Sequence, residues 1–196
     1  MMLANKFTYS VCSSREMADA YSLEIRKVAT RLLTLITQNW NLKPDYFNDK
    51  FGEDAKLSLR LNYYPPCPQP ELVLGLHPHS DPGGITLLVQ DYNTEGLNIR
   101  KEDSWISVKP IPNAFIVNIG DLVEIMSNGK YRSAMHRVIT NREKERLSIA
   151  AFYSPSYSAE IGPAQELVDQ SQHPPLYKTI SQSQFLHHHS FLRIRV

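Results

Sequence analysis

Hydrophobic residues recur every three or four positions along the first part of the chain. One apolar stripe is formed by Met17, Tyr21, Ile25, Val28, Leu32 and Leu35. This spacing predicts an amphipathic helix that ends near Asn39. Ser13 and Glu16 have the Ser-x-x-Glu spacing of a capping box, so we expect the helix to begin at Ser13. We interpret residues 13–53 as a leading helical segment, with a second, shorter helical or irregular link from Pro44 to Glu53.

From Leu57 the hydrophobic period changes to two, which predicts a strand. One face carries Leu57, Leu59, Leu61 and Tyr63, and the other carries Ser58, Arg60, Asn62 and Tyr64. The polar face of such a strand either meets water or lines a ligand cavity inside a barrel. The alternation alone leaves both possibilities open.

Further short strands follow, separated by turns rich in Gly and Pro. We expect them at residues 73–79, 85–90, 96–100, 105–108, 114–119, 131–140 and 146–153, with a short helical turn at 122–126. The nearly continuous apolar run at 114–119 predicts a strand buried on both faces. Short strands at this spacing indicate a mainly β fold with flanking helices, a sandwich or jelly roll. We predict a single domain over 1–196, with a core at 57–155 and a loop-rich C-terminal tail at 156–196.

Composition limits the classes of function. Hydrophobic residues make up 42% of the 196 positions and charged residues 21%, which is ordinary for a soluble globular protein. The formal net charge of +1 gives no attraction to nucleic acid or to membrane surfaces. Cys12 and Cys67 form no disulfide framework, and Met1 to Tyr9 lack the apolar core of a signal peptide. We therefore expect a cytoplasmic monomer that binds neither nucleic acid nor membranes.

Candidate metal ligands lie at the end of the second predicted strand. His79 and Asp81 are two residues apart, so in an extended segment their side chains leave the same face. With His136 brought alongside by folding, they would form two histidines and a carboxylate on one side of a metal, which is typical of non-haem Fe(II) oxygenases. A lone His-x-Asp is more often a turn with a surface histidine. Zinc is the competing metal, although the helical His-Glu-x-x-His of many zinc hydrolases is absent.

Arg146 and Ser148 provide a second candidate site. A guanidinium presents a planar set of donors that matches a carboxylate, and a hydroxyl two residues further along a strand reaches the same side. The charged residues at 142–145 favour a surface arginine if Arg146 is considered alone. Its position ten residues after His136 favours instead a receptor for the distal end of a dicarboxylate.

Together these segments resemble the plant 2-oxoglutarate- and Fe(II)-dependent dioxygenases, which include flavonol synthases, codeine demethylases and jasmonate oxidases. The resemblance covers residues 57–155 and is carried, in family order, by 61–68, 79–81, 118–121, 127–129, 136–137 and 146–148. It implies a double-stranded β-helix, or jelly roll, preceded by the amphipathic helix. It also implies that Fe(II) is bound by His79, Asp81 and His136, and that Arg146 and Ser148 hold the distal carboxylate of 2-oxoglutarate. The residues that match further contacts to 2-oxoglutarate are Asn62 and Tyr64.

The reaction implied by the resemblance converts 2-oxoglutarate and O2 into succinate and CO2. It hydroxylates, demethylates or desaturates a small organic metabolite, as in plant specialised metabolism. Family members are usually longer at the N-terminus, and the residues from Gln182 onward depart from the family pattern. These departures motivate an alternative, a truncated pseudoenzyme that binds metal and 2-oxoglutarate without productive turnover. Arg60 is either a contact for an acidic substrate or a structural ion-pair partner.

Overall fold

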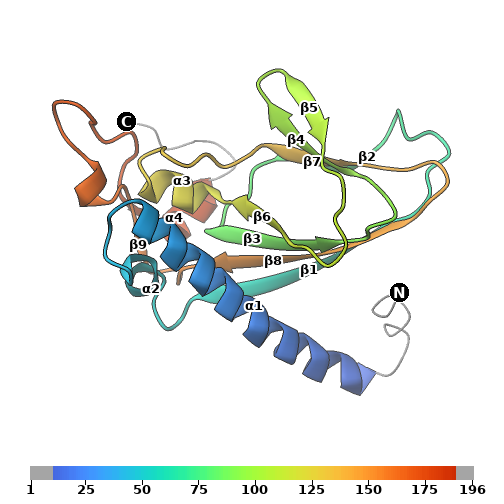
Figure 1. The fold of residues 1–196 in the computed structure, drawn as a ribbon, viewed down its shortest axis with the longest axis horizontal. Helices are drawn as coiled ribbons and strands as arrows, with labels where there is room; N and C mark the ends of the chain where they lie inside the picture. Colours follow the sequence, from blue (N-terminus) through green and yellow to red (C-terminus); the bar gives the residue numbers. More distant parts are fainter. Residues whose placement is uncertain (1–10, 189–196) are drawn as a thin grey trace.

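Two four-stranded antiparallel sheets face each other in the structure, a computed structural model that describes residues 11–188 (Figure 1). The first sheet has the order β1 (Lys56–Tyr64), β8 (Arg146–Ser154), β3 (Ile85–Gln90) and β6 (Ile116–Ile119). The second has the order β2 (Leu74–His79), β7 (His136–Ile139), β4 (Leu97–Lys101) and β5 (Ser104–Ser107). Apart from the hairpin of β4 and β5, strands that are neighbours in these two sheets are far apart in sequence. The predicted mainly β fold is confirmed.

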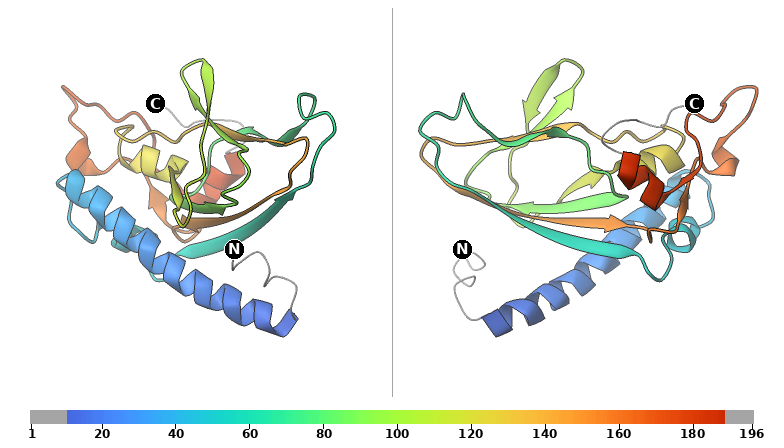
Figure 2. Two further views of the ribbon diagram at one scale, coloured as in Figure 1. Left: turned by 45° about the vertical axis from the view of Figure 1, so that its right-hand side comes forward. Right: turned by 180° about the vertical axis from the view of Figure 1, so that it is seen from behind.

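Helices cover the outer face and one end of the first sheet. They are α1 (Val11–Asn39), α2 (Tyr46–Phe51), α3 (Asp121–Met126) and α4 (Gln182–His188). Figure 2 shows α1 running beneath the first sheet, on the side away from the second sheet. The helix begins at Val11, so Ser13 lies inside it and the predicted capping-box start is wrong, whereas the predicted end at Asn39 is confirmed. Across residues 11–188 no helix combines the length and apolar character needed to cross a bilayer.

The buried side of α1 is rotated from the predicted stripe. Ile25, Ala29 and Leu33 are at most 2% exposed, and they recur at a spacing of four residues. Three members of the predicted stripe are instead exposed, namely Met17, Val28 and Leu35. Ala29 explains the difference, because a small side chain adds little to a hydrophobic pattern and still lets the helix approach the sheet closely.

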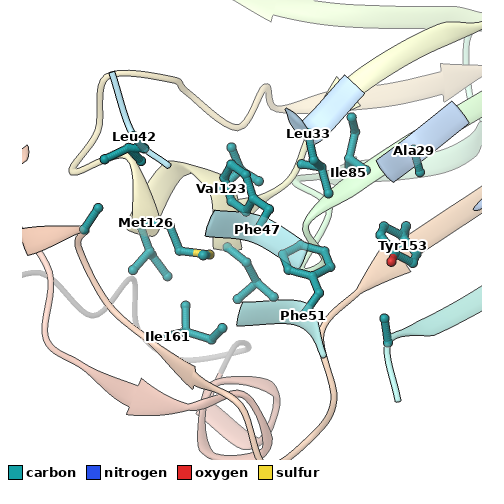
Figure 3. Packing of buried hydrophobic residues seen from close by; sticks show 14 of the residues in the cluster. Ala29, Leu33, Leu42, Phe47, Phe51, Ile85, Val123, Met126, Tyr153 and Ile161 are labelled. Atoms are coloured by element: carbon teal, nitrogen blue, oxygen red, sulfur yellow. The ribbon is translucent and has the colours of Figure 1, made fainter. Parts of the chain in front are cut away.

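The main hydrophobic core lies between the helices and the outer face of the first sheet (Figure 3). Phe47 and Phe51 of α2 are 1% exposed, and their ring centroids are 5.7 Å apart in an edge-on arrangement. Phe51 in turn packs against Tyr153 of β8 at 5.3 Å. A smaller cluster lies between the two sheets and consists of Tyr64, Leu88, Leu97, Val138 and Ala150. Because the large core lies outside the sandwich, the space between the sheets has room for a site.

Three details differ from the predicted elements. The strand expected at 114–119 is confined to β6, and Val117 is 42% exposed, so the prediction that it is buried on both faces is wrong. The strand expected at 131–140 begins only at His136. The backbone N–H groups of Tyr131 and Ser133 donate to side-chain oxygens rather than to a neighbouring strand. The tail forms β9 (Glu160–Ile161), a 3-10 turn η2 (Gln165–Leu167), β10 (Ile180–Ser181) and α4. Residues 189–196 of the predicted tail lie outside the described residues, and the single domain over 1–196 stays a prediction.

Candidate active site

The pairing of β2 with β7 brings the two candidate histidines together. His79 at the end of β2 lies directly opposite His136 at the start of β7, and their ring centroids are 4.3 Å apart. Asp81 follows β2, and its Oδ1 lies 3.9 Å from His79 Nε2 and 3.6 Å from His136 Nε2. One ligand atom from each residue lies within 4.8 Å of the others. Three groups that could hold one metal ion therefore converge from segments 55 residues apart.

Backbone carbonyls fix the orientation of both rings. The Nδ1 atom of His79 lies 2.8 Å from the carbonyl oxygen of His77, and that of His136 lies 2.9 Å from the carbonyl oxygen of Ala134. A carbonyl only accepts, so Nδ1 carries the proton in both rings and the Nε2 lone pairs face Asp81. Such hydrogen bonds are the usual support of metal-binding histidines.

The electrostatics of His79 favour the neutral form that a metal requires. Burial of the ring, the largest cause, lowers the pKa of His79, and nearby His136 and Arg60 lower it further. The His77 carbonyl and the Asp81 carboxylate partly offset these effects. His79 is therefore neutral, and able to act as a ligand, at a lower pH than an ordinary imidazole.

The carboxylate of Asp81 is the strongest indication that this cluster binds a cation. The residue is 2% exposed, and its Oδ2 has no hydrogen-bond partner among the described residues. A buried carboxylate with an unpaired oxygen is costly in free energy. A divalent cation would satisfy both the charge and the open donor atoms, so these residues fit a metal with nitrogen and oxygen ligands.

Helix α3 holds the Asp81 loop through close backbone contacts. The N–H groups of Asp121 and Leu122 donate to the carbonyl oxygens of Asp81 and Gly83 at 2.8 and 3.1 Å. A Cβ atom at Gly120 would collide with the carbonyl oxygen of Gly83. Glycine is therefore required at position 120 for the loop to lie against the start of α3.

A cavity of about 50 Å³ lies beside these three residues and between the two sheets. That volume is several times the 10–15 Å³ needed for one water molecule. The antiparallel register places Tyr64 opposite Arg146 and Asn62 opposite Ser148. The structure thus brings all seven residues singled out in the sequence to one cavity: His79, Asp81, His136, Arg146, Ser148, Asn62 and Tyr64. The polar face of β1 lines a cavity, which resolves the alternative left open by its alternation.

Arg146 enters this cavity as a buried and incompletely paired cation. The residue is 2% exposed, and its Nη2 donates to Gln90 Oε1 at 2.6 Å. Its Nε and Nη1 form no hydrogen bond of acceptable geometry among the described residues, although the guanidinium carbon lies 5.3 Å from the centroid of the Tyr64 ring. Burial, the largest cause, lowers the pKa of Arg146, while the neighbouring Tyr64 hydroxyl and Asp91 carboxylate oppose that shift. Unpaired donors on a desolvated guanidinium are suited to binding an anion.

Sequence reasoning missed several parts of this cavity. Thr86 of β3 and Asn118 of β6 are cross-strand partners that both line it, and Thr86 Oγ1 is buried without a partner in the described chain. The available signal was a single polar residue within an otherwise apolar strand. The remaining wall is apolar and includes Leu76, Leu88, Leu97, Val138, Ala150 and Phe152. Apolar walls with a few directed polar groups are typical of small-molecule sites.

Comparison with known proteins identifies the family. The model of the 2OG-Fe(II) oxygenase superfamily matches residues 55–155, just over half of the chain. The chain belongs to the 2OG-Fe(II) oxygenase superfamily. This membership confirms the predicted family and, at the level of the superfamily, the cofactors Fe(II) and 2-oxoglutarate. It also favours iron over zinc for the cluster of His79, Asp81 and His136.

Individual superfamily members are similar to most of this chain. Jasmonate-induced oxygenase 2 from Arabidopsis thaliana is 49% identical over 182 residues, which are 92% of this chain and 49% of the relative. Codeine O-demethylase from Papaver somniferum is 48% identical over 164 residues, 84% of this chain and 45% of the relative. The chain therefore spans about half the length of the curated relatives that it matches.

Solved structures agree with the jelly-roll fold. The crystal structure of JOX2 in complex with 2OG, Fe and JA superposes with a TM-score of 0.87 at 47% identity, covering 97% of this chain and 56% of that one. The dioxygenase for auxin oxidation from rice superposes with a TM-score of 0.78 at 26% identity, covering 90% and 58%. The predicted jelly roll is confirmed by these oxygenase structures.

Proposed function

We propose that the chain is a dioxygenase that binds Fe(II) through His79, Asp81 and His136 and uses 2-oxoglutarate and O2 as co-substrates. It oxidises a small organic metabolite and releases succinate and CO2. The observation that carries this proposal is a single cavity with the three candidate ligands and the incompletely paired Arg146 on its walls. We further propose that it acts as a cytoplasmic monomer in plant specialised metabolism, with no nucleic-acid or membrane partner.

In this mechanism the protein prepares the metal site. The Nδ1–H bonds to backbone carbonyls direct the two Nε2 lone pairs inward, and Asp81 neutralises one of the two cation charges. Bound Fe(II) supplies the reduction of O2, with two electrons provided by the oxidative decarboxylation of 2-oxoglutarate and two by the substrate. The apolar wall between the sheets excludes water and so limits competing reactions.

Arg146 and its neighbours bind and orient 2-oxoglutarate. The Nε and Nη1 groups of Arg146 would donate hydrogen bonds to the distal carboxylate, and the bond from Nη2 to Gln90 Oε1 holds the guanidinium in place. The hydroxyl of Ser148 and the amide of Asn62 lie side by side on β8 and β1, from which they reach the same ligand. Arg146 and the three candidate metal ligands line the same cavity, so a dicarboxylate held by Arg146 would share that cavity with the metal.

Succinate formation tests this function directly. We expect the wild-type chain to convert 2-oxoglutarate to succinate only when Fe(II) and O2 are both supplied. The His136→Ala and Arg146→Gln variants should lose this activity, whereas Arg142→Gln, an exposed arginine paired with Glu71, should keep it. Equal succinate formation by the wild type and both site variants would show that the assignment is wrong.

Arg60 favours an acidic substrate. Its side chain lines the cavity opposite the small residue Ala150, and no carboxylate of the described residues forms an ion pair with it. The related protein JOX2 was solved in complex with 2OG, Fe and JA, which supports a small organic ligand in addition to the co-substrate. Carboxylic acids should stimulate succinate formation more than their methyl esters, and Arg60→Gln should raise KM for the acids only. Equal responses to acid and ester would refute this substrate class.

A further inference from the structure

Glu124 is a buried carboxylate that the proposed reaction does not use. It lies in the middle of α3 and is 4% exposed. Its Oε1 accepts a hydrogen bond from the Tyr177 hydroxyl at 2.8 Å and lies 3.6 Å from Arg132 Nη1. Its Oε2 accepts the backbone N–H of Ser133 at 2.7 Å. Each oxygen therefore has a partner, as a buried carboxylate requires.

The bond to Ser133 lies immediately before a candidate metal ligand. Residues 132–135 form no helix or strand, so their course depends on side-chain partners such as Glu124. The carbonyl of Ala134, the residue after Ser133, accepts the Nδ1–H of His136 at 2.9 Å. Glu124 thus fixes the backbone whose carbonyl sets the tautomer and the direction of the His136 ring.

The same helix also holds the other half of the site. Ser80 Oγ donates to Asp121 Oδ2 at 3.1 Å, and the Asp121 N–H donates to the carbonyl oxygen of Asp81 at 2.8 Å. Helix α3 therefore contacts the Asp81 loop at its start and the segment leading to His136 through Glu124. The relative position of these two segments sets the separation of 3.6 Å between Asp81 Oδ1 and His136 Nε2.

We propose that Glu124 is a positioning residue for the metal site, acting through Ser133 and Ala134 on His136. This inference rests on the proposed metal-binding function of the triad. Partners that orient a metal ligand typically change metal affinity 10- to 100-fold when they are removed. Glu124 is not among the residues that line the cavity, so its replacement changes none of the lining side chains and should act on metal binding only through the position of His136.

Two variants separate positioning from general packing. Glu124→Met keeps a similar length and removes both acceptors. Glu124→Gln keeps one oxygen for the Ser133 N–H, and its amide can donate to the Tyr177 hydroxyl, so it should rescue metal binding. Tyr177→Phe is the matched control, because it removes the hydroxyl that donates to Glu124 Oε1 and leaves the Ser133 bond to Oε2 intact.

The experiment is a Co(II) titration of the full chain, followed by the visible absorption of the bound ion, with thermal melting of the metal-free proteins alongside. We expect Glu124→Met to bind Co(II) about 10- to 100-fold more weakly with an altered spectrum, and Glu124→Gln and Tyr177→Phe to bind within a few-fold of wild type. If Glu124→Met does not fold, Ser133→Pro removes the same N–H donor and should give the same loss.

Two results overturn the positioning role while leaving the proposed function intact. One is wild-type Co(II) affinity in Glu124→Met, whatever happens to its melting temperature. The other is an equal loss in Tyr177→Phe, which would indicate damage to the core rather than to the His136 segment. Absence of Co(II) binding by the wild-type chain would instead overturn the proposed function, and this inference with it.

Discussion

Replacing Arg146 by Gln should weaken 2-oxoglutarate binding strongly without harming the metal site. The guanidinium is 2% exposed and has two nitrogen atoms, Nε and Nη1, without a partner among the described residues. A hydrogen bond to a charged group contributes about 1.5–3 kcal/mol. Loss of two such bonds to the distal carboxylate costs about 3 kcal/mol or more, which is at least a 100-fold increase in Kd.

The assay is calorimetric titration of 2-oxoglutarate under anaerobic conditions, in the presence of saturating Co(II). A second ligand, 2-oxobutyrate, serves as the internal reference, because it keeps the 2-oxo acid group and lacks the distal carboxylate. Arg146→Gln should reduce the affinity for 2-oxoglutarate about 100-fold and leave that for 2-oxobutyrate nearly unchanged. Arg142→Gln, at an exposed ion pair, controls for the loss of one positive charge.

Loss of affinity for both ligands by the same factor would refute this reasoning. Such a result would mean that Arg146 supports the shape of the cavity rather than binding the distal carboxylate. Burial lowers the pKa of Arg146 against the opposing effects of Tyr64 and Asp91, so the charged form is disfavoured relative to a guanidinium in water. The metal-free Arg146→Gln protein should therefore be no less stable to urea than the wild type.

Three further changes test separate parts of the site. Ser148→Ala removes one buried hydroxyl beside Asn62. It should weaken 2-oxoglutarate binding by about 1.5 kcal/mol, roughly 10-fold, in the same titration. An unchanged Kd would exclude Ser148 as a contact. Gly120→Ala places a Cβ against the Gly83 carbonyl. The free energy of unfolding should fall by about 1–3 kcal/mol, which lowers the Tm by about 2–12 °C. An unchanged Tm would show that the loop adjusts freely. The folded-state pKa of His79 lies below its ordinary value of 6.5, so the unfolded chain binds the proton more readily than the folded chain. The contribution of neutral His79 to the free energy of unfolding is therefore full above pH 6.5. It is lost as the pH falls through 6.5 toward the folded pKa. Urea unfolding of the metal-free protein should therefore show a loss of stability from pH 7.5 to pH 5.5 that is smaller in His79→Gln, and equal losses would contradict the direction of the shift.

The elements that bear the site were predictable because their signals are local. A strict alternation marks β1, and His79 and Asp81 stand two residues apart at the point where β2 ends. The cross-strand register then brings the site residues together, because His79 pairs with His136 and Asn62 pairs with Ser148. The spacing of the motifs in sequence predicted these contacts only through the resemblance to a family.

Features that depend on tertiary packing were not predictable from the pattern. Ala29 lies at the centre of the buried face of α1, although alanine carries almost no hydrophobic signal. The apolar run at 114–119 predicts that Val117 is buried, yet Val117 lies on β6 at the edge of its sheet and is 42% exposed. Glu124 looks like a solvated helix residue, and only its bonds to Tyr177 and Ser133 show why it is buried.

The central claim is that one cavity of this chain holds Fe(II) and 2-oxoglutarate together. It is tested most directly by mixing the metal-free protein anaerobically with Fe(II) and 2-oxoglutarate and recording the visible charge-transfer absorption of the chelate. Wild-type protein should develop this absorption with one Fe(II) per chain, and Asp81→Ala, which removes the buried carboxylate, should not. No absorption in the wild type, or an equal absorption in Asp81→Ala, would contradict the assignment.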